Sequence, residues 1–133
     1  MTWALDFAEV CAVIFGCAHF FTGLGVFLRP KAMSLFVLSG EWKCEEKGVV
    51  ENPNTGTYAA RQMAIGAVCW AAAGFYERNT LIVAAICVVV RVLFDIIDKF
   101  KTGLHAWLLG PFAVVGSLHI AIIVLLFVVE PAP

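Results

Sequence analysis

Long apolar segments separated by short polar ones run along the whole chain and predict four membrane-spanning helices. The apolar segments cover residues 5–28, 58–75, 80–100 and 106–129. Each approaches or exceeds the roughly 20 residues that a helix needs to cross a hydrocarbon core of about 30 Å. The segments take up most of the chain. The pattern therefore predicts an all-α fold, an integral membrane antiparallel four-helix bundle formed by residues 1–133 as one domain.

The longest polar segment is the connection at residues 29–57. Arg29-Pro30 ends the first apolar segment, because proline lacks the backbone donor that would continue a helix. Turn-forming residues at 52–56 then lead into the second helix. The connection has two interpretations: a lid over one end of the bundle, or only a link between two helices.

The composition of the 133 residues excludes two classes of protein. Hydrophobic residues make up 62% and charged residues 14%, whereas soluble domains have roughly 45–50% apolar and 25% charged residues. A water-soluble globular fold is therefore excluded, and the lipid bilayer is an expected partner. The formal net charge is -1, so the chain lacks the basic character that binding to nucleic acid requires.

Basic residues determine the expected orientation, because loops rich in Lys and Arg stay on the cytosolic side of a membrane. They gather in the connection at 29–57 and after the third helix, at Arg29, Lys31, Lys43, Lys47, Lys99 and Lys101. Both loops are therefore expected in the cytosol, and both chain termini on the lumenal or exterior side. The predicted location is multi-pass in a membrane, that of the endoplasmic reticulum if the source is eukaryotic.

The cysteines and histidines do not predict a cofactor. The five cysteines lie in apolar segments or in the expected cytosolic connection, where thiols stay reduced. Their spacing relative to the histidines does not match a zinc, haem or iron–sulfur motif. We therefore expect neither a metal nor a redox cofactor.

Ionisable residues inside the third helix are the strongest functional signal. Arg91, Asp95 and Asp98 follow one another at spacings of four and three, so they occupy an arc of roughly 60° on one helix face. A charge near the bilayer centre costs roughly 2.5–3.5 kcal/mol even on a lenient insertion scale. Residues of this kind in a membrane span need a physical reason to be there.

Helical rise places polar residues of the other helices at similar depths. His19 lies about nine residues before the cytosolic end of the first helix, at roughly the depth of Arg91. Arg61 and Gln62 lie near the cytosolic start of the second helix, and Tyr58 is its first residue. The sequence predicts that these side chains converge on one pocket open to the cytosolic leaflet.

This cluster has a structural interpretation and a functional one. Arg91 can pair with Asp95, and Arg61 can pair with Asp95 or with Asp98, and such pairs would only fix the packing of the bundle. The cluster nevertheless holds more ionisable groups than one packing contact needs, and this excess indicates a site. Asp98 also fits a position at the membrane interface, and His19 also fits an ordinary core position.

As a site, the cluster predicts general acid/base chemistry on a lipophilic small molecule. The candidate catalytic residues are Asp95, Asp98, Arg91, Arg61 and His19, and the candidate substrate-binding residues are Tyr58 and Gln62. Asp95 is the expected base and Asp98 or His19 the acid, while the arginines orient groups and stabilise charge. This division suits epoxide opening, cyclisation or isomerisation. The alternatives are a non-catalytic membrane assembly or scaffold subunit, and a carrier of a small anion or a quinone.

Small residues and a further histidine are expected to serve packing. His119 in the fourth helix fits a packing or helix–helix hydrogen-bonding role. Glycines allow two backbones to approach closely, and they recur in the first, second and fourth helices at Gly16, Gly23, Gly66, Gly74, Gly110 and Gly116.

Four motifs together resemble a family of small membrane proteins. They are GLGVFLRP at the end of the first helix, YAARQMAIG at the start of the second, RVLFDIID in the third, and a fourth helix with His119. Over nearly its whole length the chain resembles the small four-helix membrane proteins related to the DoxX-like family. The resemblance implies an antiparallel four-helix bundle and, as for fungal members, a role in secondary-metabolite pathways. Further copies of the chain or enzymes of the same pathway are the implied protein partners.

Overall fold

Four helices lie in the part of the chain that the structure, a computed structural model, describes: residues 3–29, 54–102 and 109–129. They are α1 (Trp3–Leu28), α3 (Asn54–Phe75), α4 (Arg78–Thr102) and α5 (Leu109–Val129). The prediction of an all-α fold with four helices is confirmed. Side chains are described in these ranges except at residues 54–56, 98–102 and 109. The predictions for residues 30–53, a lid or a link, lie outside the described residues.

Three of the described helices, α1, α4 and α5, are long and apolar enough to cross a membrane. Their outer faces carry large exposed apolar side chains, including Ile14, Phe21, Val90, Phe94 and Val124. Apolar surface on this scale is unfavourable in water and is suited to contact with lipid. The helices therefore support a membrane protein.

The second helix in the described chain, α3, differs from the other three. It is not among the helices that combine the length and the apolar character of a membrane span within the described ranges. Arg61 and Gln62 lie inside it, and much of the remainder is alanine and glycine rather than larger apolar residues. These residues are suited to close packing and polar contacts more than to lipid.

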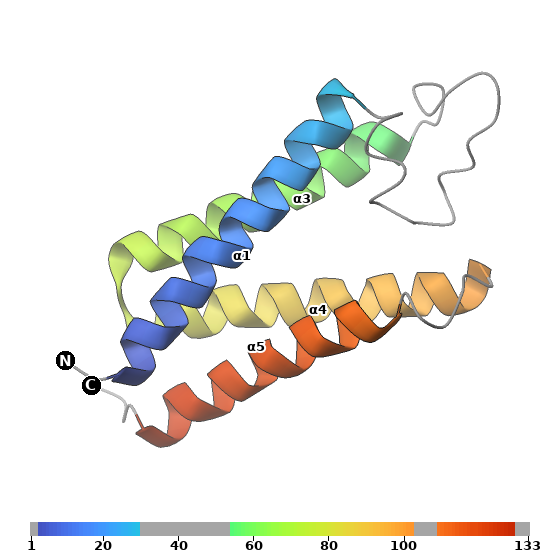
Figure 1. The fold of residues 1–133 in the computed structure, drawn as a ribbon. Coiled ribbons are helices and arrows are strands. Elements are labelled where there is room, and N and C mark those ends of the chain that lie inside the picture. Colours follow the sequence, from blue (N-terminus) through green and yellow to red (C-terminus); the bar gives the residue numbers. More distant parts are fainter. Residues whose placement is uncertain (1–2, 30–53, 103–108, 130–133) are drawn as a thin grey trace, which may run out of the picture.

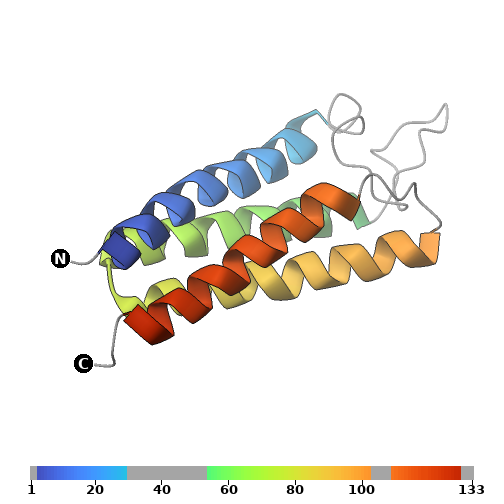
Figure 2. The ribbon, with the colours of Figure 1, turned by 60° about the horizontal axis from the view of Figure 1, so that its bottom comes forward.

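The helices are arranged as two neighbouring pairs. α1 packs along α3, and α4 packs along α5. Figure 1 shows the two pairs meeting at the end that carries both chain termini and diverging toward the other end. Figure 2 shows from a second side that the N- and C-termini lie at the same end. The turn between α3 and α4 joins the pairs where they meet, so polar residues farther along the helices can face the space between the pairs.

Glycine brings the backbones of α1 and α3 close together. A Cβ added at Gly66 would lie 2.6 Å from a backbone nitrogen of α1, and one added at Gly23 would lie 2.6 Å from the carbonyl oxygen of Ala59. Since real Cβ atoms do not approach other atoms so closely, only glycine fits at these positions. The prediction of close approach is confirmed at Gly16, Gly23 and Gly66, but it is wrong at Gly74 and Gly110, where an added Cβ would meet nothing within 4 Å.

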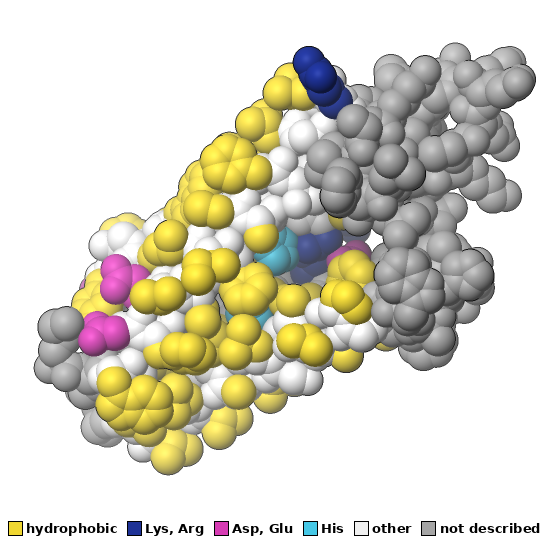
Figure 3. All heavy atoms as spheres, in the orientation of Figure 1, with side chains coloured by type: hydrophobic (Ala, Val, Ile, Leu, Met, Phe, Trp, Pro, Cys, Tyr) yellow, Lys and Arg dark blue, Asp and Glu magenta, His cyan; other side chains and the backbone are white. Residues whose placement is uncertain are grey.

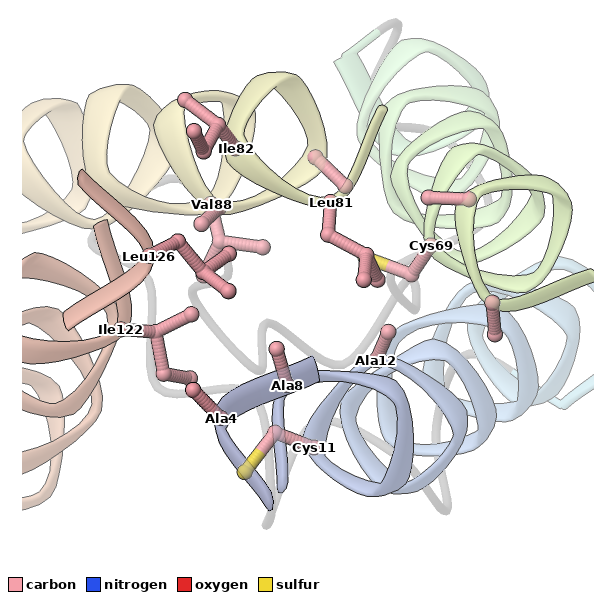
Figure 4. Close-up of a cluster of buried hydrophobic side chains, with 14 of the residues drawn as sticks. Ala4, Ala8, Cys11, Ala12, Cys69, Leu81, Ile82, Val88, Ile122 and Leu126 are labelled. Carbon is pink, nitrogen blue, oxygen red and sulfur yellow. The ribbon is translucent and has the colours of Figure 1, made fainter. Parts of the chain in front are cut away.

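Small apolar side chains fill the space where the two pairs meet. Ala4, Ala8 and Ala12 follow at intervals of four residues and so share one face of α1. Figure 4 shows them in one cluster with Leu81 of α4 and Leu126 of α5. Leu126 is fully buried. This cluster holds the pairs together at one end and lets them separate at the other.

Arg78 ties the start of α4 to the end of α5. Its Nε atom donates a hydrogen bond to the carbonyl oxygen of Leu126 at 3.0 Å. The last four carbonyl groups of a helix have no partner within the helix, so this contact satisfies one of them and places a cation at the negative end of the helix dipole. The guanidinium also lies 4.8 Å from the ring centroid of Phe127. Arg78 therefore acts as a cap for α5.

Tyr76 ends α3 and connects the turn to α1. Its φ angle is 51°, a left-handed conformation that commonly terminates helices but is unfavourable for residues other than glycine. The Tyr76 amide donates to the carbonyl of Ala72 at 3.1 Å, and its hydroxyl donates to the carboxylate of Asp6. Below, the turn end denotes Asp6, Tyr76, Glu77, Arg78 and Leu126.

Candidate functional site

Polar side chains from all four helices gather in the hollow between the two helix pairs. Figure 3 shows basic, acidic and histidine side chains together in this hollow, with hydrophobic side chains around it. The cleft cluster, as we call it, consists of His19 of α1, Tyr58 and Gln62 of α3, Arg91 and Asp95 of α4, and His119 of α5. Both histidines, Tyr58 and Gln62 are buried.

An ion pair within α4 supplies the charges of the cleft cluster. Nη2 of Arg91 lies 2.9 Å from Oδ2 of Asp95, and the two side chains are 15% and 17% exposed. The buried Oδ2 atom thus faces the guanidinium, and it has no further hydrogen-bond partner among the described residues. The opposite charges of Arg91 and Asp95 make the pair electrically neutral as a whole. The Oδ2 atom of Asp95 retains its capacity to accept a hydrogen bond.

Each of the two histidines is oriented by a carbonyl of its own helix. Nδ1 of His19 donates to the carbonyl of Phe15 at 2.7 Å, and Nδ1 of His119 donates to the carbonyl of Val115 at 2.8 Å. Because a carbonyl oxygen only accepts, Nδ1 carries the proton in both rings. The neutral rings therefore present Nε2 as an acceptor.

Tyr58 lies between two arginines. The guanidinium carbon of Arg61 and that of Arg91 each lie 5.9 Å from the centroid of the Tyr58 ring, within the range of a cation–π interaction. Nε2 of Gln62 donates a hydrogen bond to the Tyr58 hydroxyl at 2.8 Å. Arg91 and Tyr58 thus connect α4 with α3 through an aromatic face.

Aromatic and electrostatic contacts extend the cluster to α1 and α5. The rings of Phe15 and His119 meet edge to face, with centroids 4.7 Å apart and an interplanar angle of 72°. His19 lies within electrostatic range of Arg91, Asp95 and His119. The six residues therefore form one continuous group.

The hydrogen bonds and the ion pair given above for the cleft cluster share one feature: each joins two residues four apart in the same helix, whereas the contact of Arg91 with the Tyr58 ring joins α4 to α3. The spacing of four holds for His19 with Phe15, His119 with Val115, Gln62 with Tyr58, and Arg91 with Asp95. Contacts of this kind orient a side chain without tying two helices together. They differ from the hydrogen bonds expected of polar residues that serve only to hold membrane helices against each other.

A small cavity lies beside the cluster, toward the turn end. Its volume is about 10 Å³, and His119 lines it together with alanine, cysteine and larger apolar side chains from all four helices. This is roughly the space that one water molecule needs. His119 thus borders both the cleft cluster and the interior of the bundle.

The structure brings together most of the residues that the sequence singles out. His19, Arg91 and Asp95 meet with Tyr58 and Gln62, as the helix depths predict. The prediction that Arg91 pairs with Asp95 is confirmed.

Two further candidate residues differ from the main group. Arg61 is exposed, and in the described part of the chain it forms no ion pair with Asp95; its contact is with the ring of Tyr58. Because Asp95 pairs with Arg91 instead, the predicted Arg61–Asp95 pair is not formed, and the alternative pair of Arg61 with Asp98 lies outside the described side chains. The side chain of Asp98 lies outside the described residues, so its expected role as an acid stays a prediction.

Two residues of the site were not predicted as members from the sequence. His119 was expected to serve packing, and it does contact Phe15, but it also lies within range of His19. Phe15 lies four residues before His19, so its place on the same face of α1 was available from helical periodicity. For His119 the sequence contained no comparable signal, because its neighbourhood depends on how α5 packs against α1.

The arrangement combines a carboxylate, a guanidinium and two acceptor imidazole nitrogens in a largely apolar environment. These groups can bind a polar substituent and move a proton.

Among the described residues no group of three His, Cys, Asp or Glu side chains is placed to hold a metal ion. Comparisons with protein-family models, with curated proteins and with solved structures gave no match.

Proposed function

We propose that the chain is a multi-pass integral membrane protein whose four helices cross the bilayer as an antiparallel bundle, α3 included. Both termini then lie on the lumenal or exterior side, with the connection between α1 and α3 in the cytosol. The apolar outer faces of α1, α4 and α5 support this proposal. Packing against α1 lets α3 cross without a fully apolar surface of its own.

Single cysteines at the two ends of the bundle test this topology. We expect Cys introduced at Glu77, in a chain without its native cysteines, to react with a membrane-impermeant maleimide from the lumenal or exterior side. Cys introduced at Arg29 should react only after the membrane is permeabilised. Reaction of both from the same side would show that α3 does not cross the membrane.

We further propose that the cleft cluster processes a lipophilic small molecule by general acid/base chemistry, as in epoxide opening, cyclisation or isomerisation. Asp95 is the base, and Arg91, whose Nη2 lies 2.9 Å from its carboxylate, orients it. His19 accepts and returns a proton through Nε2, while Tyr58 and Gln62 bind the substrate. Asp98 and Arg61 are a second acid and an orienting cation at the cytosolic side. The resemblance to DoxX-like proteins points to a secondary metabolite as the substrate.

One observation carries this proposal: the cleft cluster concentrates polar groups from all four helices, and the ion pair and the histidine hydrogen bonds described for it lie within single helices. Asp95 retains a buried acceptor atom, and His19 presents a second one from another helix. Buried polar groups in a membrane protein that keep acceptor atoms for a further hydrogen bond are suited to act on a ligand.

Extracts from cells that produce the protein test the enzymatic proposal. Mass spectrometry of lipophilic extracts should show one precursor accumulating when the gene is deleted. Asp95→Asn should reproduce the deletion although the protein reaches the membrane, because the amide cannot accept the proton. Glu77→Gln, an exposed carboxylate at the turn end, serves as the matched control and should restore the product. Normal product with Asp95→Asn would overturn Asp95 as the base.

A scaffold role is the second candidate, and the glycine contacts between α1 and α3 favour it. They show that a large part of the chain serves close helix packing. A carrier of small anions fits less well, since Arg91 is already neutralised by Asp95. A scaffold would predict that Asp95→Asn changes stability without changing the product.

A further inference from the structure

The charge balance of the cleft cluster restricts the kind of substituent that it can receive. Arg91 and Asp95 neutralise each other within α4. A ligand that brought a carboxylate or phosphate into this buried site would place a second negative charge near Asp95, and beyond Arg91 the described residues at Tyr58 offer only Arg61, which is exposed to solvent. Burial of an unmatched charge is strongly unfavourable. The site therefore favours a neutral ligand.

The acceptor atoms restrict the substituent further. Oδ2 of Asp95 is buried beside Nη2 of Arg91 at 2.9 Å and has no further hydrogen-bond partner among the described residues, although a carboxylate oxygen can accept more than one hydrogen bond. The fixed proton positions leave Nε2 of His19 and of His119 as acceptors. These acceptors come from α4, α1 and α5. They require a group that donates a hydrogen bond, because two acceptors cannot pair with each other. A ketone, a quinone or an ether does not supply that hydrogen.

Arg91 supplies hydrogen-bond donors that complement these acceptors. Its guanidinium has five N–H donors, and its described contacts are the Asp95 carboxylate and the face of the Tyr58 ring. The remaining donors suit an oxygen that accepts while its own hydrogen is donated to Asp95 or His19. A hydroxyl group has both properties and carries no charge.

We propose that the cleft cluster recognises the hydroxyl group of a neutral lipophilic alcohol, and that it discriminates against carboxylates, quinones and ethers of the same apolar shape. The inference rests on the proposed function, because it names the substrate class of the same site. In the proposed reaction this hydroxyl is the group that Asp95 deprotonates: the O–H bond of the substrate breaks, and its proton forms a new O–H bond with the Asp95 carboxylate. The apolar walls around the cluster hold the hydrocarbon part.

Photoaffinity labelling with three matched probes tests this inference. The probes share one long alkyl chain with a diazirine and end in a hydroxyl, a methyl ether or a carboxylate. Purified protein in lipid nanodiscs is irradiated, and labelled peptides of α1 and α4 are quantified by mass spectrometry. We expect the alcohol to label the cleft peptides about tenfold more than the ether or the carboxylate, because each of those leaves buried polar groups unpaired or adds a charge.

Two variants of Asp95 should change this preference in opposite ways. Asp95→Asn leaves Arg91 without its counter-charge, so labelling should shift from the alcohol toward the carboxylate probe. Asp95→Glu keeps the charge and should keep the preference for the alcohol. Glu77→Gln should behave like the unchanged protein. Monodisperse elution of each variant establishes that it is folded, and Asp95→Glu tests the inference if Asp95→Asn does not fold.

The outcomes separate this inference from the function on which it rests. Equal labelling of the cleft by all three probes, or preference for the carboxylate in the unchanged protein, would overturn hydroxyl recognition. Either result would leave a lipophile-binding site standing. Labelling by all probes only on lipid-facing surfaces would overturn both the inference and the proposed function.

Discussion

Polar contacts at the turn end and in the cleft cluster are organised in different ways. At the turn end they join segments far apart in sequence: Tyr76 donates to Asp6, and Arg78 donates to the carbonyl of Leu126. In the cleft cluster the contacts described above join residues four apart in one helix. The first arrangement holds helices together, whereas the second orients side chains toward the space between helices. Changes at the turn end are therefore expected to affect stability alone, whereas changes in the cleft cluster are expected to affect function as well.

The largest effect on stability is expected from breaking the ion pair of the cleft cluster. Arg91→Met leaves the Asp95 carboxylate buried without a counter-charge and should lower the free energy of unfolding by about 3–5 kcal/mol. The double variant Arg91→Met, Asp95→Leu removes both charges and should recover most of this loss. If the pair is part of a site, the double variant is stable but forms no product.

Unfolding in mixed micelles, followed by tryptophan fluorescence, measures these differences. Product formation is measured on the same preparations. A stable double variant that still forms product would show that the pair serves packing alone. That result would favour the scaffold role over the enzymatic role.

A smaller effect is expected from two glycines that lie in the two regions. Gly23 lies beside Gln62, whose Cβ would be 2.8 Å from an added methyl group, and beside the Ala59 carbonyl at 2.6 Å. Gly23→Ala should push α1 away from α3 next to the cleft, with a loss of about 1–3 kcal/mol and a loss of probe labelling.

Gly74→Ala is the matched control near the turn end. An added Cβ there meets nothing within 4 Å, and alanine favours the helix by up to about 1 kcal/mol relative to glycine. Thermal midpoints in detergent should therefore fall for Gly23→Ala and stay level or rise for Gly74→Ala. Equal midpoints for the two variants would show that close approach of α1 and α3 does not position the cleft.

Contacts set by helical periodicity were predictable from the sequence, whereas contacts set by packing were not. The spacing of Arg91 and Asp95 was sufficient to predict their pairing, and helical rise was sufficient to place His19 near them. Whether Arg78 contacts the end of α5 depends instead on which helix lies beside the α3–α4 turn. For the same reason sequence alone did not distinguish Gly66, which faces α1, from Gly74, which faces open space.

The smallest effect is expected from Arg78, and it should fall on stability alone. Arg78→Met keeps an aliphatic side chain but removes the hydrogen bond to the Leu126 carbonyl and the contact of the guanidinium with Phe127. The expected loss is about 1–2 kcal/mol, because a charged donor capping a helix end contributes this much. Product formation and the preference for the alcohol probe should remain unchanged, because Arg78 lies at the turn end.

Arg78→Lys provides the control for this variant. Lysine keeps the positive charge near the end of α5 but does not reproduce the planar guanidinium that donates through Nε. Its thermal midpoint should therefore lie between those of Arg78→Met and the unchanged protein. If Arg78→Met abolished product at a temperature where the protein is folded, the turn end and the cleft would be functionally coupled. The expectation that the turn end affects stability alone would then be wrong.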